Sequence, residues 1–185
     1  MPSEEVVIEK LSALPEYAEG FKKAFNKESQ PLTYKNIGVA IAAFEKTLLT
    51  PSPFDSFLEG KLNALSKKQK RGLKTFMDVG CITCHNGQGV GGGMFQKLGL
   101  ANEYQTKDLG RYELTKDEND KFFFKVPSLR NITKTAPYFH DGSLKYLKTV
   151  VKIMGKHQLD VNLSSKQISD IVAFLNSLTG SLPKF

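Results

Sequence analysis

Cys81, Cys84 and His85 are the residues whose types and spacing point most directly to chemistry. They stand in the stretch CITCH, and the two cysteines are the only ones in the 185-residue sequence. Two thiols separated by two residues serve as a redox-active disulfide, as half of a zinc site or as the attachment point of a covalent cofactor. The rest of the sequence decides among these three uses.

The disulfide and zinc interpretations find little support around these residues. A disulfide between cysteines three apart closes a very short loop and adds little stability. Such a pair is normally redox-active and lies in a thioredoxin-like βαβ unit, which the sequence does not show. A structural zinc ion needs four ligands, generally with a second pair at a matching spacing. No second cysteine pair exists, and His140 and His157 are poorly placed to supply one.

The C-x-x-C-H pattern uses all three residues at once, as a c-type haem attachment site. Two thiols one helical turn apart can form thioethers with the two vinyl groups on one porphyrin edge, and the adjacent histidine becomes an axial iron ligand. The pattern accounts for every cysteine and follows a predicted helix. The sequence therefore predicts one covalent haem c, attached through Cys81 and Cys84, with His85 as an iron ligand.

The second axial ligand of an electron-transfer haem is usually a methionine or a histidine. Met77 precedes Cys81 by one helical turn, so it is expected on the proximal side of the haem. Met94 stands in a glycine-rich loop only nine residues after His85, which leaves little chain to reach the opposite face.

Met154, in the stretch KIMGKHQ, has enough chain before it to wrap to the far side of the haem. It also completes an apolar helical stripe, where methionine is a common core residue. Gly155 is expected to break the helix there and to free the sulfur. From the residues alone, Met154 is the preferred candidate, His140 comes next and Met94 follows, while His157 is expected to be a surface residue.

Helix signals recur along the chain, whereas strand signals are few, so the predicted fold class is mainly α with long loops. The stretch TPSPF, residues 50–54, is interpreted as a linker between a helical segment, residues 1–50, and a haem domain, residues 51–185. Residues 86–110 are predicted to be loop, and RYELT and KFFFKVPSL are expected to pair as a short hairpin. Helices are predicted for residues 4–14, 15–25, 34–48, 143–154, from Ser66 toward Cys81, and from Ser164 to Gly180.

The formal net charge of +7 permits a nucleic acid, an anionic membrane or an acidic protein as a partner. No aromatic-interleaved basic stripe or zinc-finger spacing appears, so nucleic-acid binding is not expected. No apolar stretch is long enough to span a membrane. The lysines of SKKQKRGLK, residues 66–74, are interpreted as a solvated helix face, with an acidic redox partner as the alternative. Arg111 and Arg130 are candidates for pairing with haem propionates.

Taken together, these residues resemble the C-terminal haem half of bacterial di-haem cytochrome c peroxidases. The resemblance runs through AIAAFEKTLLTPSPFD, LSKKQKRGLKTFMDVGCITCHNG, KVPSLRNITKTAPYFHDGSL, VVKIMGKHQL and DIVAFLNSL. It implies a class I cytochrome c-like fold, His85 as the proximal ligand and Met154 as the distal ligand. It also implies a calcium ion that takes carbonyl oxygens from the loop of Thr135 and Pro137.

In such proteins this haem has the high potential, accepts electrons from a small cytochrome c or cupredoxin, and passes them to a second, peroxide-splitting haem. The family carries two CxxCH motifs and this sequence carries one. The expected function is therefore electron transfer, as the electron-accepting domain of an enzyme that reduces hydrogen peroxide. Alternatives are a single-haem peroxidase active in its own right and a non-catalytic haem sensor.

Residues 1–50 resemble the helices that follow the N-terminal haem half, so that half or its equivalent is an expected partner. If the apolar faces of this segment lack that partner, a homodimer is a further possibility. The beginning, MPSEEVVIEK, lacks the basic and apolar pattern of a signal peptide. Because covalent haem attachment normally follows export, the expected location is the periplasm, in a mature or truncated form of the chain.

Overall fold

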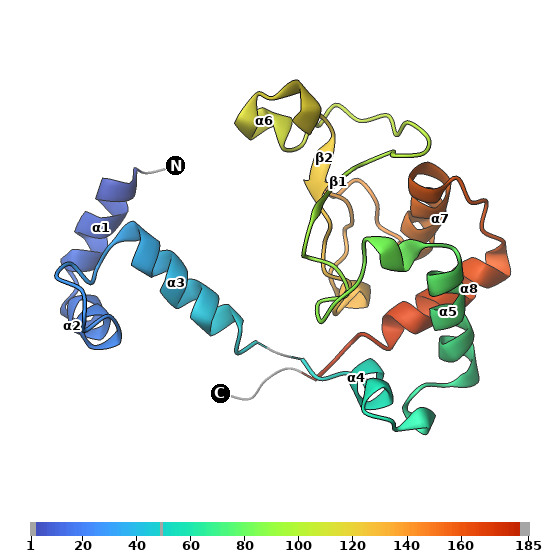
Figure 1. Ribbon diagram of the computed structural model, residues 1–185, viewed down its shortest axis with the longest axis horizontal. Helices are drawn as coiled ribbons and strands as arrows, with labels where there is room; N and C mark the ends of the chain where they lie inside the picture. Colours follow the sequence, from blue (N-terminus) through green and yellow to red (C-terminus); the bar gives the residue numbers. More distant parts are fainter. Residues whose placement is uncertain (1–2, 49, 182–185) are drawn as a thin grey trace. The chain divides into compact units, whose positions relative to one another are not determined.

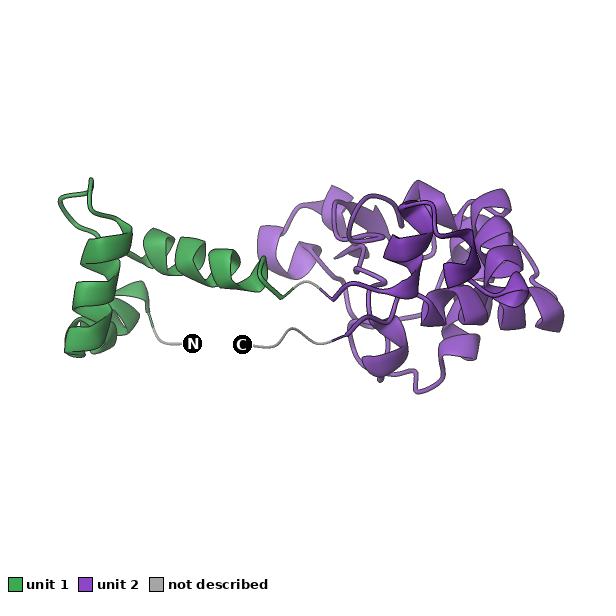
Figure 2. Cartoon of the chain, turned by 90° about the horizontal axis from the view of Figure 1, so that it is seen from below, with its two compact units in different colours: residues 1–49, 182–185 green, residues 50–181 purple. Residues whose placement is uncertain are grey.

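The computed structural model describes residues 3–48 and 50–181. These residues fall into two compact units, one drawn from residues 1–49 and the other comprising residues 50–181 (Figure 2). The fold is mainly α-helical, as the sequence predicts. No helix in the described ranges is long and apolar enough to cross a membrane.

The first unit contains three helices whose beginnings follow local sequence signals. The N–H of Val6 donates to the Ser3 hydroxyl at 3.5 Å, Pro15 occupies the first turn of its helix, and the N–H of Asn36 donates to the Thr33 hydroxyl at 3.1 Å. Each arrangement satisfies or removes an N–H that a helix terminus leaves unpaired. The helices are α1 (Glu4–Ser12), α2 (Pro15–Ala24) and α3 (Tyr34–Glu45).

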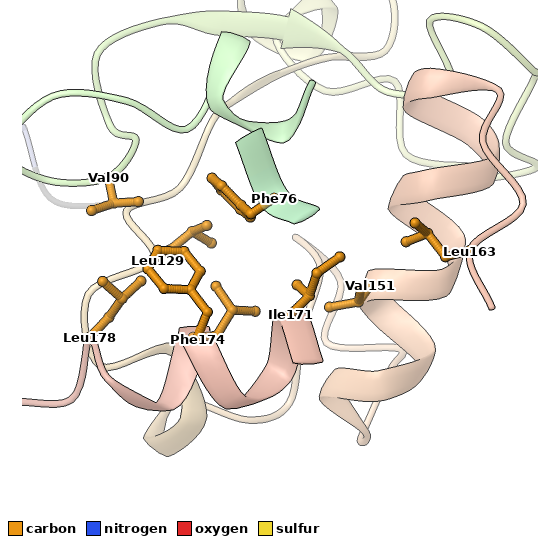
Figure 3. Close-up of a cluster of buried hydrophobic side chains, with 9 residues drawn as sticks. Phe76, Val90, Leu129, Val151, Leu163, Ile171, Phe174 and Leu178 are labelled. Atoms are coloured by element: carbon orange, nitrogen blue, oxygen red, sulfur yellow. The ribbon is translucent and has the colours of Figure 1, made fainter. Parts of the chain in front are cut away.

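The second unit is organised around helix α8 (Ser165–Asn176), which packs along α5 (Lys67–Asp78) and also against α7 (Leu147–Leu159). Figure 1 shows α5 and α8 side by side. The capping boxes predicted at Ser66 and Ser164 are present at the beginnings of α5 and α8. Nine buried residues form the hydrophobic core (Figure 3): Phe76, Val90, Leu129, Val151, Leu163, Ile171, Phe174, Leu175 and Leu178.

Helix α7 differs from its prediction at both ends. It begins at Leu147 rather than near residue 143, and it continues through Gly155 to Leu159. Gly155 is buried inside the helix, where an ideal Cβ would lie 2.9 Å from Cδ1 of Leu163. The expectation that Gly155 breaks the helix is therefore wrong, because the glycine serves close packing against the following segment. Similarly, α8 ends at Asn176, before the predicted stop at Gly180.

The predicted hairpin is also wrong in its pairing. Strand β2 (Phe123–Lys125) pairs antiparallel with β1 (Phe95–Lys97), which lies in the region predicted as loop. The stretch RYELT instead contains helix α6 (Tyr112–Thr115). The Thr115 hydroxyl donates to Asp120 at 2.8 Å, which closes this segment on itself, while the N–H of Arg111 at its start donates to the Phe123 carbonyl of β2 at 2.8 Å.

The remaining elements are short. Helix α4 (Pro53–Leu58) begins inside the stretch that was expected to be only a linker. The Ser52 hydroxyl and N–H both donate to the Asp55 carboxylate at 2.7 Å, which fixes the first turn of α4. The 3-10 helices are η1 (Leu62–Ala64), η2 (Cys81–Thr83), η3 (Glu118–Asp120) and η4 (Ile132–Lys134).

Candidate haem site

The CITCH stretch forms a tight turn directly after α5. Gly80 adopts a left-handed conformation, with φ +94°, that ends α5 and redirects the chain into η2. The carbonyl of Cys81 then accepts the N–H of His85 at 3.0 Å. This bond closes one helical turn around Cys81, Cys84 and His85, so the three predicted site residues are brought together. Both cysteines are half-buried and are not joined by a disulfide.

The environment of Cys81 disfavours free-thiol chemistry. Burial raises the pKa of Cys81 to about 11. The neutral thiol that results at pH 7 is a weak nucleophile and a weak metal ligand, because both roles belong to the thiolate. Cys81 also packs against the hydrophobic core. A residue held in this way suits a thioether anchor better than it suits a redox or zinc site.

The imidazole of His85 has one nitrogen that is buried without a hydrogen-bond partner in the described part of the chain. This atom is Nδ1. Burial lowers the pKa of His85, and the nearby carbonyl oxygens of Val90 and Pro127 partly offset this shift, although neither completes a hydrogen bond to Nδ1. A neutral imidazole is the form that binds iron, and a ligating histidine usually offers its other N–H to a backbone carbonyl. His85 therefore fits the role of a haem ligand bonded through Nε2.

Gly91 allows the backbone of the loop to lie close to the His85 ring. An ideal Cβ at this position would overlap the Pro127 carbonyl and would lie 3.1 Å from His85 Nδ1. Gly91 also has a φ of +123°, which side-chain-bearing residues rarely adopt. In the sequence, the glycine-rich stretch after CITCH is the signal for this close packing, but it does not show that Gly91 is the glycine that the packing requires. The chain thus provides a cradle for the ring that only glycine accommodates.

The loop that follows His85 is fastened to a distant segment of the chain. The N–H of Gly92 donates to the Val126 carbonyl at 2.9 Å, and the N–H of Leu129 donates to the Val90 carbonyl at 3.1 Å. Val90 is only 5% exposed and has a φ of 49°, an unfavourable conformation for a β-branched residue. Its burial in the core holds the loop in this strained form beside His85.

Among the candidate methionine ligands, burial distinguishes Met154 from the others. Met77 and Met94 are 49% and 39% exposed, whereas Met154 is half-buried in α7. Val151, one turn earlier in the same helix, belongs to the core. The assignment of Met154 as distal ligand stays a prediction, and its burial is consistent with that role.

The two other histidines have different environments. The side chain of His140 is 72% exposed and lies 3.7 Å from the Asp108 carboxylate, so it is a surface group. His157 is half-buried at the end of α7, with Nδ1 against the backbone carbonyls of Asn102 and Glu103 at 3.1 and 2.9 Å. The expectation that His157 is a simple surface residue is wrong.

The two arginines proposed for propionate binding have partners within the protein, and propionate binding by them stays a prediction. Both terminal nitrogens of Arg130 donate to the Asp55 carboxylate at 2.7 Å, and its Nε donates to the Gln88 carbonyl at 3.0 Å. Arg111 pairs with Asp120 at 3.1 Å. Arg130 therefore joins α4 to the loop that follows the CITCH turn.

The predicted calcium loop lies after η4. Thr135 and Pro137 are exposed, and the Thr135 hydroxyl donates to the Ile132 carbonyl at 3.3 Å. Within the described ranges, no three His, Cys, Asp or Glu side chains gather as a metal site. Calcium binding through backbone carbonyls of this loop stays a prediction.

A helix that leads into a CxxCH turn, a half-buried histidine with a buried Nδ1 atom and a half-buried methionine on another helix are the features of a c-type cytochrome site. Comparisons with known proteins agree with this class. The di-haem cytochrome c peroxidase model matches residues 1–63, and the cytochrome c model matches residues 69–179. The chain therefore belongs to the cytochrome c family over most of its length, and its first third matches the di-haem cytochrome c peroxidase family.

Individual relatives cover nearly the whole chain. It is 44% identical over 97% of its length to cytochrome c551 peroxidase of Pseudomonas aeruginosa, and 46% identical over its full length to that of Nitrosomonas europaea. The crystal structure of a MauG-like protein associated with microbial copper homeostasis matches 96% of the chain with a TM-score of 0.73 and 27% identity. The chain spans 54% and 56% of the two peroxidases and 62% of the MauG-like chain.

Proposed function

We propose that this chain is the electron-accepting haem c domain of a periplasmic enzyme that reduces hydrogen peroxide. The observation that carries the proposal is one CITCH turn, in which Nδ1 of the half-buried His85 is itself buried and burial lowers the pKa of the imidazole, together with a half-buried Met154 on α7. When bound through Cys81 and Cys84, haem c supplies one-electron transfer.

The side chains of the site favour an electron carrier over a reaction centre. His85 and Met154 would hold the haem iron, and a methionine ligand raises the reduction potential. On the histidine side, Cys81 packs against the hydrophobic core, and the Phe76 ring lies beside the His85 ring with centroids 6.4 Å apart. Peroxide reduction is assigned to the rest of the enzyme, because the family model for the di-haem peroxidases implies a second haem and this sequence has one CxxCH motif.

The charge of the haem unit supports an acidic electron donor, either a small cytochrome c or a cupredoxin. Residues 50–181 contain 19 lysines and arginines against 12 aspartates and glutamates, whereas residues 1–49 contain 6 against 7. Helix α7 contains no acidic residue and presents Lys148, Lys152 and Lys156 on its exposed face. Complementary charge of this kind accelerates the encounter of redox partners.

The first unit supports a second partner, the N-terminal haem domain of the enzyme. Tyr34 and Ile41 stand seven residues apart in α3 and are 47% and 53% exposed, and Leu48, just after the helix, is 41% exposed. Apolar residues on one side of a helical segment normally pack against another element. A second copy of this chain would cover the same residues in a homodimer.

Absorption spectroscopy of the oxidised holoprotein tests the proposal. A methionine–iron(III) bond gives a weak charge-transfer band, which we expect in the wild type and in Met94→Ala but not in Met154→Ala. Survival of the band after addition of hydrogen peroxide is expected for a closed electron carrier. A wild type without the band, or loss of the band with peroxide, would overturn the proposal and favour a single-haem peroxidase.

A further inference from the structure

The last turn of α7 is joined to residues 97–104 by hydrogen bonds from both the backbone and the side chains. The Gln158 carboxamide accepts the N–H of Gly99 at 3.0 Å and donates to the Lys97 carbonyl at 2.7 Å. The N–H groups of Ala101 and Asn102 both donate to the His157 carbonyl at 3.0 Å. We call residues 97–104 the strap.

The strap also contributes a side chain to this junction. The Asn102 carboxamide donates to the Lys156 carbonyl at 2.9 Å and to the Asp160 carboxylate at 2.7 Å. The Lys156 carbonyl is one of the groups that a helix end leaves without an intrahelical partner. Thus Asn102 of the strap caps the end of α7, while Gln158 of α7 satisfies two backbone groups of the strap.

His157 lies at the centre of the junction. Its Nδ1 is 3.1 Å from the Asn102 carbonyl and 2.9 Å from the Glu103 carbonyl. Carbonyl oxygens only accept hydrogen bonds, so Nδ1 must carry a proton. The imidazole ring also meets the Tyr104 ring edge to face, with centroids 5.3 Å apart, and the Tyr104 ring meets Phe139 in the same way at 5.3 Å.

Met154 precedes His157 by three residues on the same helix. Side chains at this spacing lie on the same side of a helix, about one turn apart. The junction therefore holds the turn of α7 that follows Met154, and it does so on the side of the helix that carries the Met154 side chain. On the preceding turns, α7 is fixed by Val151, which packs in the core. Met154 lies between these two anchored positions.

We infer that His157 is a positioning residue for Met154, and this inference rests on the proposed ligation of the haem by Met154. The proton on Nδ1 holds the strap against α7, and the strap in turn keeps this part of the helix from shifting away. Without the donor, two carbonyl oxygens of the strap lose their shared partner. The methionine–iron bond would then open more often and admit an external ligand.

The test is imidazole binding to the oxidised holoprotein, followed by absorption spectroscopy together with the methionine–iron band. His157→Phe removes the donor but keeps a flat ring beside Tyr104, whereas His157→Gln restores one N–H. Because loss of a partnered hydrogen bond changes an equilibrium by roughly tenfold, we expect His157→Phe to bind imidazole about tenfold more tightly. His157→Gln should show a smaller increase.

Two further variants complete the test. Asn102→Ala weakens the same junction from the strap and should also increase imidazole affinity. It therefore tests the inference even if His157→Phe does not fold. Thr149→Ala changes an exposed side chain on α7 outside the junction and should match the wild type.

The results separate the two inferences. Wild-type imidazole affinity in both His157→Phe and Asn102→Ala would overturn the positioning inference. If Met154→Ala itself binds imidazole as the wild type does, Met154 is not the ligand and the proposed function fails instead.

Discussion

The α-carbon of Gly72 in α5 lies against the backbone carbonyl of Asp170 in α8. An ideal Cβ on Gly72 would overlap that carbonyl and would come within 2.9 Å of Cβ of Phe174. The two helices that support the CITCH turn therefore cross at a distance that a glycine sets. The Asp170 side chain reinforces the crossing, because its carboxylate accepts hydrogen bonds from Arg71 at 3.1 and 3.3 Å.

Gly72→Ala should consequently destabilise the haem unit. The added methyl group meets backbone atoms that cannot rotate away, so the helices must separate, and overpacking of this kind costs about 1–3 kcal/mol. Urea unfolding should show a lower midpoint with an unchanged slope. The matched control is Gly38→Ala in α3, where an added Cβ has no neighbour within 4 Å and a small gain in stability is expected. Equal midpoints for Gly72→Ala and the wild type would refute this account of the crossing.

Gly91→Ala should impair haem attachment. The new methyl group would displace the Pro127 carbonyl or the His85 ring, and Gly91 holds a φ that disfavours alanine. We expect the purified protein to contain several-fold less covalent haem per chain, measured by the haem absorbance of the unfolded protein relative to total protein. Gly93→Ala, in the same loop, has open space around it and should retain normal haem content. A normal haem content in Gly91→Ala would contradict the claim that only glycine at this position leaves room for the His85 ring.

The CITCH site, the mainly helical class and the caps of the long helices follow from the sequence because each depends on neighbouring residues. Ser66 and Gln69, for example, form their capping box within one turn. The pairing of β1 with β2 could not be predicted, since its partners lie far apart and both strands are three residues long.

The errors at Gly155 and His157 share a cause. The role of each residue depends on a distant segment, because Leu163 packs on Gly155 and a strap carbonyl accepts a hydrogen bond from His157. The pairing of Asp55 with Arg130 depends on a distant segment in the same way. Local propensity predicts that Gly155 breaks the helix and that His157 is a surface group. Tertiary contacts override this. Met154 remains a sequence-based assignment that the fold accommodates.

The pairing of Asp55 with Arg130 should make the stability of the haem unit depend on pH in acid. Partial burial acts to raise the pKa of Asp55, but hydrogen bonds from Arg130 and Ser52 outweigh it and lower the pKa to about 2. Because the pKa of Asp55 is lower in the folded protein than in the unfolded chain, where it is near 3.9, the ionised carboxylate stabilises the fold in full at pH values above the unfolded-state pKa. This stability is lost as the pH falls from about 4 to about 2.

Asp55→Asn should therefore lower the free energy of unfolding at pH 7 by about 1–2 kcal/mol. It should also flatten the loss of stability between about pH 4 and pH 2. Urea unfolding at a series of pH values measures both effects. Asp78→Asn is the control, because Asp78 forms an exposed pair with Lys74 and such pairs contribute little. If the two variants show the same pH profile, the Arg130 pairing does not stabilise the fold.

Lys148 and Lys152 should govern the rate at which an acidic donor reduces the haem unit. They stand one turn apart on α7, and no acidic residue lies between Asp141 and Asp160 to neutralise them. Like charges at this spacing repel one another, so folding does not explain their arrangement. Reversing both in Lys148→Glu with Lys152→Glu should slow reduction by an acidic cupredoxin about tenfold or more at low ionic strength.

Stopped-flow reduction of the oxidised holoprotein at several salt concentrations measures this effect. The difference from the wild type should shrink as salt rises, because screening weakens the attraction between exposed charges. Lys116→Glu with Lys121→Glu is the matched control: it changes the net charge equally at lysines that are already paired with Glu113 and Glu118. An equal slowing by both double variants would show that overall charge, and not the face of α7, attracts the donor.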